Sequence, residues 1–410
     1  MQAINRQRLF NASCIALVVT AMTFAIRAGI LTELSKEFQL TDTQLGWVNS
    51  MAFLGFPVAT IIGGLLYNIF GAKKLMWAAF VSHLLGLILT IYAGGFFGLL
   101  ISTFLIGFAN GMVEAACNPM IADMYYDNQT TMLNKFHVWF PGGIVIGGLC
   151  AYFMGNAELG WQLQIAVMLI PTLLYAFLIF GQEFPENENL DTSTKSNLRS
   201  LFTTPLYLFM VFCMTLTATT ELGTQQWVER ILGNAGAHPM LVLVLVTGLM
   251  AVGRYFAGPV VHRLNPVGVL LTSAVIATIG IVLMSQATGM MVYLAAVIFA
   301  IGVMYFWPTM IGFVGEYTPE TGALGMSLIG GAGMFATSMW QPVIGSWLDS
   351  ERDKALASGL AEEAAELAAG QATLDNIAVF PAILIVAFGV LFFFRKKLED
   401  RRVGSHKDMV

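Results

Sequence analysis

Glu114 is an acidic residue in an otherwise apolar run of the sequence, with Asn110 one turn before it and Asn118 one turn after it. Residues four apart lie on the same side of an α-helix. A carboxyl group inside a membrane span is costly, so its presence there indicates a pathway for ions or a solute. We therefore predict that Glu114 takes up and releases a proton, and that Asn110 and Asn118 contact a solute. The alternative is that Glu114 hydrogen-bonds a neighbouring helix and only fixes packing.

His137 lies shortly after the polar hairpin that follows this run, directly before Val138 and Trp139. Measured from the centres of the two predicted helices, its depth differs from that of Glu114 by only a few ångström, since each residue adds about 1.5 Å. Histidine changes its charge near physiological pH. We predict that His137 and Glu114 share a proton. The alternative is a histidine at a helix end that bonds a backbone carbonyl or reaches the membrane interface.

Arg27 lies on a helical stripe with Thr20 and Thr23 in the first apolar run. An arginine inside a membrane needs a partner. One hypothesis is a structural ion pair with Glu114 or Glu221. Another is that Arg27 anchors an anionic group of a solute, which a guanidinium can grip with two hydrogen bonds. A third is that its side chain reaches the outer interface.

Glu221 falls near the middle of a later apolar run, on a predicted helix face with Thr217, Thr224 and Gln225. The face combines a carboxylate with hydroxyl and amide groups, which suits contact with a polar solute. We therefore interpret Glu221 and Gln225 as candidate solute ligands. The alternative for Glu221 is a local carboxylate that the adjacent threonines cap.

The composition explains where these groups must lie. Of the 410 residues, 57% are hydrophobic and 11% are charged, whereas soluble domains contain about 25% charged residues. The mean hydropathy is +0.73, which indicates an all-α membrane protein. A net charge of −5 argues against binding of nucleic acid, which requires a basic face. The four cysteines show no CxxC or metal-ligand spacing, so neither a metal nor a cofactor is expected.

We predict twelve transmembrane helices, each near the ~20 residues needed to cross a bilayer. A polar linker at 183–204 separates a six-helix bundle at 1–182 from a second one at 205–410. Within the second half, leucines repeat on one helical stripe of the acidic stretch 349–375, which predicts an extracytoplasmic amphipathic surface helix. A basic cytoplasmic tail follows the last span.

An internal repeat supports this division. Aligning Gly64 with Gly258 gives an offset of about 194 residues, roughly one six-helix half. At this offset Arg27 and Glu221 are pseudo-equivalent, and parallel repeats place the solute site near the midplane between the halves. Opposite charges at these positions predict a gate or an ion pair across the half-interface.

The basic residues set the orientation. With the amino terminus inside, fourteen lysines and arginines fall on the cytoplasmic side and four on the other. Because cytoplasmic loops carry the excess of positive charge, we expect a multi-pass protein of the plasma membrane, the inner membrane of a bacterium, with both termini cytoplasmic.

Several motifs are similar to those of one family of membrane proteins. They are Glu114 to Pro119, Asn134 to Gly143, the pair Gly253-Arg254, and more loosely Trp307-Pro308-Thr309. The chain thereby resembles the major facilitator superfamily, and within it the fucose–proton symporter group of sugar transporters. The resemblance implies two pseudo-symmetric six-helix bundles, a proton-coupling role for Glu114, and a polar side chain facing the cavity at the position of His137. It also implies a carboxylate in the first span, where this sequence has Arg27 instead.

Two further candidates come from the later spans. Trp307 and Tyr305 are separated by about 200° on a helix, so only one of them can face a cavity, and we select Trp307. An aromatic face suits the apolar side of a sugar ring, although aromatic residues at helical spacing also serve packing. Gln341, beside Trp340, is the candidate of the eleventh span.

These observations favour a secondary active transporter that moves a monosaccharide or sugar derivative together with protons by alternating access. The solute would be acidic if Arg27 binds it. The alternative is an organic-anion carrier with Arg27 as the anchor and no proton coupling. An integral membrane enzyme is a remote alternative, because no DxxxD, HExxH or paired His/Asp cluster is expected at membrane depth. The expected partners are the solute, protons and the bilayer, and the expected state is a monomer.

Overall fold

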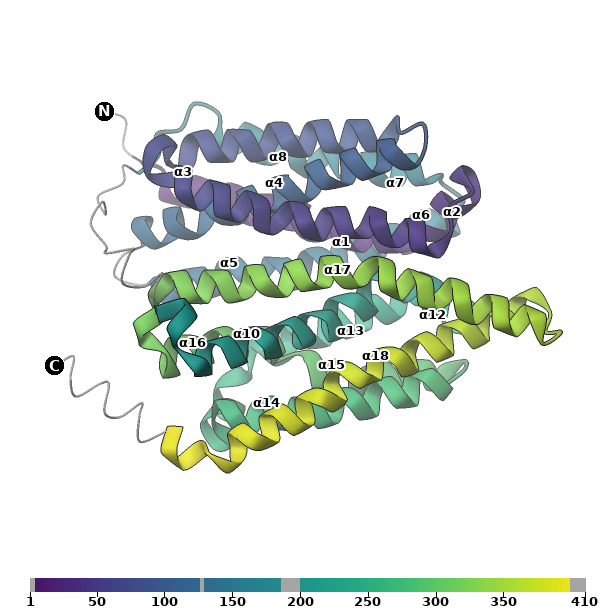
Figure 1. The fold of residues 1–410 in the computed structure, drawn as a ribbon. Coiled ribbons are helices and arrows are strands. Elements are labelled where there is room, and N and C mark those ends of the chain that lie inside the picture. Colours follow the sequence, from purple (N-terminus) through teal and green to yellow (C-terminus); the bar gives the residue numbers. More distant parts are fainter. Residues whose placement is uncertain (1–3, 126–128, 186–199, 399–410) are drawn as a thin grey trace.

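The chain folds into two helical bundles that lie side by side, with α17 along the boundary between them (Figure 1). The computed structural model describes residues 4–125, 129–185 and 200–398, and the regular structure within these ranges is helical. The helices of the first bundle are α1 (Arg6–Gly29), α2 (Leu31–Phe38), α3 (Asp42–Ile91), α4 (Phe96–Met124), α5 (Gln129–His137), α6 (Trp139–Asn156), α7 (Trp161–Ala166) and α8 (Leu169–Ile179).

The second bundle begins with a span that changes its helix type. α10 (Pro205–Ala218) passes into a π-helix (Thr219–Gly223) and then into α11 (Thr224–Gln226) and α12 (Val228–Leu232). The remaining helices are α13 (Pro239–Tyr255), α14 (Ala257–Gln286), α15 (Met290–Val303), α16 (Phe306–Tyr317), a 3₁₀ turn (Pro319–Thr321), α17 (Gly322–Ala357) and α18 (Glu362–Phe393). α1 begins and α18 ends at the same end of the molecule, which we call the terminal end; the opposite end is the far end.

The predicted number of spans is confirmed. Ten helical segments of the described chain are long and apolar enough to cross a membrane. The shorter apolar helix α13 and the less apolar helix α17 bring the number of crossings to twelve. The chain is therefore a multi-pass membrane protein.

Two chain breaks stand at corresponding places in the two bundles. Inside α3, Gly71 has φ +70°, and inside α14, Asn265 has φ +51°. Glycine and asparagine are the residues that tolerate this left-handed backbone, so each ends one span and starts the next. The two positions are 194 residues apart, the same offset as Gly64 and Gly258 in the sequence repeat.

Glycines bring the backbones of α3 and α4 into contact. A Cβ on Gly55 would collide with the backbone of Phe104, and one on Gly107 with the backbone of Ala52. Small residues at helix interfaces allow this close approach within a membrane, where packing replaces the hydrophobic effect. The bundle that carries Arg27 and Glu114 is thus tightly assembled.

The stretch 349–375 differs from the prediction of a separate surface helix. α17 continues to Ala357, and α18 already begins at Glu362. The two extended helices meet in a turn that projects at the far end (Figure 1). The leucine stripe is divided between them, because Leu356 is 42% exposed whereas Leu374 is 1% exposed. The predicted basic tail beyond 398 and most of the linker lie outside the described residues.

Candidate functional site

Arg27 is buried between the two bundles near the far end of α1, with 6% of its surface exposed. Its Nε donates to Asn49 Oδ1 on α3 at 3.1 Å, and its Nη2 donates to Gln226 Oε1 on α11 at 2.7 Å. The guanidinium also lies 5.1 Å from the ring centroid of Phe24 and 5.7 Å from that of Phe53. Cation–π contacts and amide oxygens therefore surround a charge that is almost completely shielded from water.

No carboxylate of the described residues forms an ion pair with Arg27. The predicted pairing with Glu221 is wrong, because Glu221 Oε1 lies 3.1 Å from Arg254 Nη2 within the second bundle. The predicted pairing with Glu114 is also absent, since that carboxylate accepts from Asn118 Nδ2 at 2.7 Å. Arg27 is thus a buried charge held by neutral amides, an arrangement that is costly without a counter-ion.

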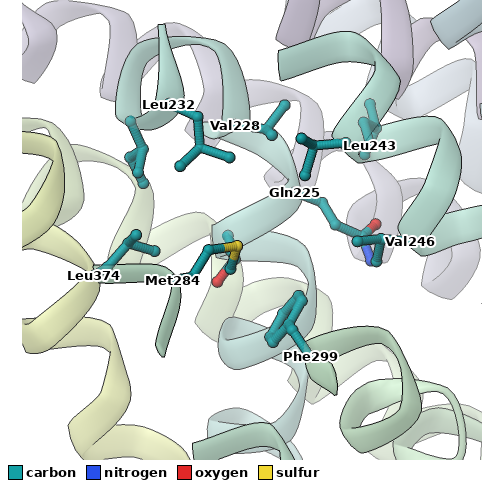
Figure 2. A pocket seen from close by; sticks show the side chains of 11 residues that line it. Gln225, Val228, Leu232, Leu243, Val246, Met284, Phe299 and Leu374 are labelled. Atoms are coloured by element: carbon teal, nitrogen blue, oxygen red, sulfur yellow. The ribbon is translucent and has the colours of Figure 1, made fainter. Parts of the chain in front are cut away.

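Gln226 reaches Arg27, whereas the predicted solute ligand Gln225 does not. The π-helix contains one residue more per hydrogen-bonded turn than an α-helix, and this rotates the residues that follow Gly223. Gln225 consequently points into the second bundle, where its Nε2 lies 3.4 Å from Met250 Sδ. There it lines a small, mostly apolar cavity with Val246, on which Figure 2 is centred.

An aromatic and aliphatic cluster lies beside Arg27 and joins both bundles; we call it the central cluster. Its members are Phe24, Phe53, Leu222 and Met334, with Phe56, Phe140 and Trp307 packed against them. The ring centroids of Phe24 and Phe53 are 5.2 Å apart, and those of Phe24 and Phe140 are 6.0 Å apart. The predicted residue Trp307 thus packs against the central cluster, whereas Tyr305 donates to Gly253 O at 3.1 Å.

Gln341 lies on α17 where this helix meets the first bundle. It is fully buried, and neither its side-chain oxygen nor its nitrogen has a partner. Its backbone packs against Gly46 of α3, and one turn earlier Ser338 hydrogen-bonds Ser50 at 2.9 Å. An unpaired buried amide is costly, so Gln341 remains a candidate ligand at the interface.

Glu114, Asn118 and His137 form a continuous chain towards the terminal end. Asn118 donates its Nδ2 to the Glu114 carboxylate at 2.7 Å. Its Oδ1 therefore faces His137 Nε2, which lies 3.1 Å away and donates the hydrogen. Glu114 is half-buried and His137 is exposed. The structure thus brings the two predicted proton-coupling residues together through an amide rather than in direct contact.

Asn110 belongs to a different network, which the sequence analysis missed. It donates to Thr23 Oγ1 at 2.9 Å and accepts from His83 Nε2 at 2.8 Å, and His83 Nδ1 lies 3.1 Å from Tyr175 Oη. All of these groups are buried. Asn110 thus links four helices of the first bundle one turn below Arg27. The signal for His83 was its place in an apolar run, the same signal that identified Glu114.

Charged residues close the far end between the two bundles. Arg230 of α12 donates two hydrogen bonds to Asp42 of α3, at 2.7 and 2.8 Å, and Arg352 of α17 donates a third at 2.9 Å. The carboxylate of Asp349 accepts from the first backbone N–H groups of α3, those of Asp42 and Thr43, where the helix dipole favours negative charge. We call these residues the far-end network.

A half-buried carboxyl lies beside this network, beyond the last residue of its span. Glu229 Oε2 accepts from the backbone N–H of Thr32 at 3.0 Å, so it also joins the two bundles. Burial raises the pKa of Glu229 to about 6. Burial also raises the pKa of the neighbouring Glu33 on α2. Both groups therefore hold a proton more readily than an exposed carboxyl does.

Twelve crossings in two bundles, with a buried cation at the boundary and a closed far end, define a membrane protein of the twelve-helix facilitator architecture. The model of the Major Facilitator Superfamily matches residues 13–341. The chain belongs to this superfamily.

Comparison with known proteins gives partial matches in sequence and a full match in fold. The chain is 25% identical over 161 residues to a D-xylose transporter of Levilactobacillus brevis, covering 39% of this chain and 35% of that protein. It is 26% identical over 145 residues to a hexuronate transporter of Bacillus subtilis, covering 35% and 34%. The chain thus spans about a third of the length of these relatives. A bacterial homolog of the lysosomal transporter Spinster, solved inward-facing and unoccupied, superposes with a TM-score of 0.78 at 14% identity, covering 97% of this chain and 98% of that one.

Proposed function

We propose that the chain is a secondary active transporter that carries a sugar derivative with an acidic group, such as a sugar acid, together with protons. The observation that carries this proposal is Arg27, a buried guanidinium with no carboxylate partner among the described residues. An uncompensated buried charge costs several kcal/mol, and an anionic solute would remove that cost.

The groups around Arg27 are matched to a solute that accepts hydrogen bonds. Arginine has no acceptor atom, so the amides of Asn49 and Gln226 must turn their oxygens towards it. Their NH₂ groups point elsewhere, and both are buried without a partner. One guanidinium and two free amide donors form a set that fits a carboxylate with a neighbouring hydroxyl.

The central cluster supports a ring-shaped solute. Phe24 and Phe53 offer apolar faces beside the guanidinium, and Trp307 packs against the same cluster. The C–H face of a sugar ring packs well on such surfaces. The similarity to a D-xylose transporter and to a hexuronate transporter agrees with a sugar and with a sugar acid.

Proton coupling is assigned to Glu114, with His137 beside it. Protonation of Glu114 would neutralise a carboxylate that lies half-buried on the terminal side of the solute site, and would thereby favour one of the two bundle arrangements. With both termini cytoplasmic, the far-end network closes the outer side of a monomer in the plasma membrane. The same Arg27 site would also serve an organic-anion carrier without proton coupling.

Binding to purified protein tests the solute class. We expect D-glucuronate to raise the thermal unfolding temperature of the wild type while D-glucose does not. In Arg27→Gln the apparent affinity for D-glucuronate should fall by about tenfold to a hundredfold, because a charge-assisted hydrogen bond contributes about 1.5–3 kcal/mol. Equal weakening of both sugars, or stabilisation by D-glucose alone, would contradict the proposal.

A further inference from the structure

Gln226 joins the two bundles at the same guanidinium that the proposed function assigns to the solute. Its Oε1 accepts from Arg27 Nη2 at 2.7 Å, although the two residues belong to opposite bundles. Gln226 is 3% exposed, and its Nε2 has no hydrogen-bond partner. The side-chain oxygen of Gln226 therefore has Arg27 as its hydrogen-bond partner, whereas its NH₂ group has no partner among the described residues.

An amide oxygen and a carboxylate oxygen compete for the same donor. Arg27 Nε is already taken by Asn49, so an incoming carboxylate can form two parallel hydrogen bonds only through Nη1 and Nη2, and Gln226 already accepts from Nη2. A carboxylate is the stronger acceptor, because charge-assisted hydrogen bonds are about twice as strong as neutral ones. A bound acid would consequently displace Gln226 and release its NH₂ group as a further donor.

This competition bears on a step that every carrier performing net transport must complete. After the solute has left, the empty protein has to close and reorient, and a buried unpartnered arginine would oppose that closure. We propose that Gln226 is an internal substitute for the carboxylate of the solute, which lets the empty protein close its far end and which the solute displaces. The inference rests on the proposed function, because it takes Arg27 as the anion anchor.

The surroundings of Gln226 allow it to withdraw. It ends α11, which directly follows the π-helix Thr219–Gly223. Return of such a segment to α-helical hydrogen bonding would rotate the next residues by about 100°. A small cavity lined by Thr224, Gln225 and Val228 borders the same segment (Figure 2).

The test separates net transport from exchange in protein reconstituted into vesicles. For Gln226→Ala we expect exchange of internal for external D-glucuronate to remain within about twofold of the wild type, because the solute itself neutralises Arg27 in every step. Net uptake into empty vesicles should fall by about tenfold or more, since the empty protein has lost its charge-assisted hydrogen bond. The matched control is Gln225→Ala, which faces Met250 and should alter neither rate.

A second measurement requires no solute. Spin labels at Thr41→Cys and Lys354→Cys, both exposed at the far end on opposite bundles, report the separation of the bundles in the empty protein. Gln226→Ala should add a population with a longer distance, whereas Gln226→Glu, which places a permanent carboxylate beside Arg27, should keep the short distance and abolish D-glucuronate binding.

The outcomes distinguish the two proposals. A wild type that neither binds nor exchanges D-glucuronate contradicts the proposed solute class. A wild type that transports it, combined with a Gln226→Ala variant that loses exchange and net uptake by the same factor or loses neither, overturns the role of Gln226. An unchanged label distance in Gln226→Ala overturns it as well.

Discussion

Glu221 and Arg254 form an ion pair inside the second bundle, with 3.1 Å between Glu221 Oε1 and Arg254 Nη2. Arg254 also donates from Nε to Met304 O at 2.8 Å, which holds the guanidinium in place. Glu221 is therefore neutralised by its own bundle and is not available to Arg27. Within the described spans, Glu221 therefore has a counter-ion in its own bundle, whereas Arg27 has none.

Loss of Arg254 should be strongly destabilising. In Arg254→Ala the Glu221 carboxylate would remain buried without a counter-ion, which costs about 3–5 kcal/mol, and thermal unfolding in detergent should show a lower midpoint. The double variant Glu221→Gln with Arg254→Ala should recover much of this loss. Arg27→Gln removes an unpaired charge and should cost far less; a comparable loss there would show that Arg27 is a structural partner.

The sequence identified the buried charges but could not pair them. Arg27, Glu114 and Glu221 were found because an ionisable group inside an apolar run is expensive. Their partners depend on how the helices pack, and the repeat offset that placed Arg27 opposite Glu221 says nothing about the side-chain distance. The partner of Glu221 is Arg254 of the Gly253-Arg254 motif, which lies on helix α13, and only the packing of the helices shows that the two residues meet.

Glu114→Gln should abolish accumulation of solute against a gradient while leaving exchange in place. Glutamine keeps the size and the hydrogen bond to Asn118 but cannot release a proton, so the solute can still cross without being coupled. Uptake of D-glucuronate into vesicles with and without an imposed pH gradient measures the two activities. Accumulation at the wild-type level in Glu114→Gln would remove this residue from the coupling step and would favour an uncoupled anion carrier.

Asn118→Ala provides the matching control for this chain of contacts. It leaves both titratable groups in place but removes the amide that joins Glu114 to His137. We expect accumulation to fall while exchange persists, because the amide no longer links Glu114 to His137. Accumulation at the wild-type level in Asn118→Ala would show that the amide serves packing alone.

The choice of polar face on the seventh span shows where helical periodicity fails. A regular period of 3.6 residues grouped Gln225 with Glu221, but the π-helix Thr219–Gly223 shifts the register and brings Gln226 to Arg27. Hydrogen bonding from residue i to i+5 leaves no clear mark in the amino-acid sequence. The fold was easier to predict, because span length and hydropathy follow directly from bilayer thickness.

Acidification should favour closure of the far end. Burial raises the pKa of Glu229 from its ordinary value of 4.5 to about 6 in the closed arrangement, so this arrangement binds the proton more tightly than an open one would. Above pH 6 the closed state carries the full cost of burying the charge, and the cost disappears as the pH falls below 4.5. As the pH falls from about 7.5 to about 5, the ratio of closed to open protein should rise by on the order of tenfold.

The spin-label pair at Thr41 and Lys354 measures this shift directly in the empty protein. Glu229→Gln should keep the far end closed at both pH values and should abolish the pH dependence, because glutamine retains the acceptor for Thr32 and carries no charge. A pH dependence that survives in Glu229→Gln would assign the effect to another group, such as Glu33.

Gly46→Ala should hold the far end open without unfolding either bundle. A Cβ at Gly46 would lie 2.5 Å from Gln341 O and from Pro342 Cα, both in the backbone of α17, and a backbone cannot yield as a flexible side chain can. Because this contact joins opposite bundles, the clash opposes closure but leaves the packing within α3 and α4 intact. We expect a longer distance between labels at Thr41 and Lys354. We also expect at least about a tenfold loss of exchange, since a steric clash of this kind destabilises the closed arrangement by more than about 1.4 kcal/mol. The control is Gly64→Ala, where a Cβ meets nothing within 4 Å, and this variant should leave the label distance and the exchange rate unchanged. A Gly46→Ala protein with the wild-type label distance would show that the two bundles can close without this contact.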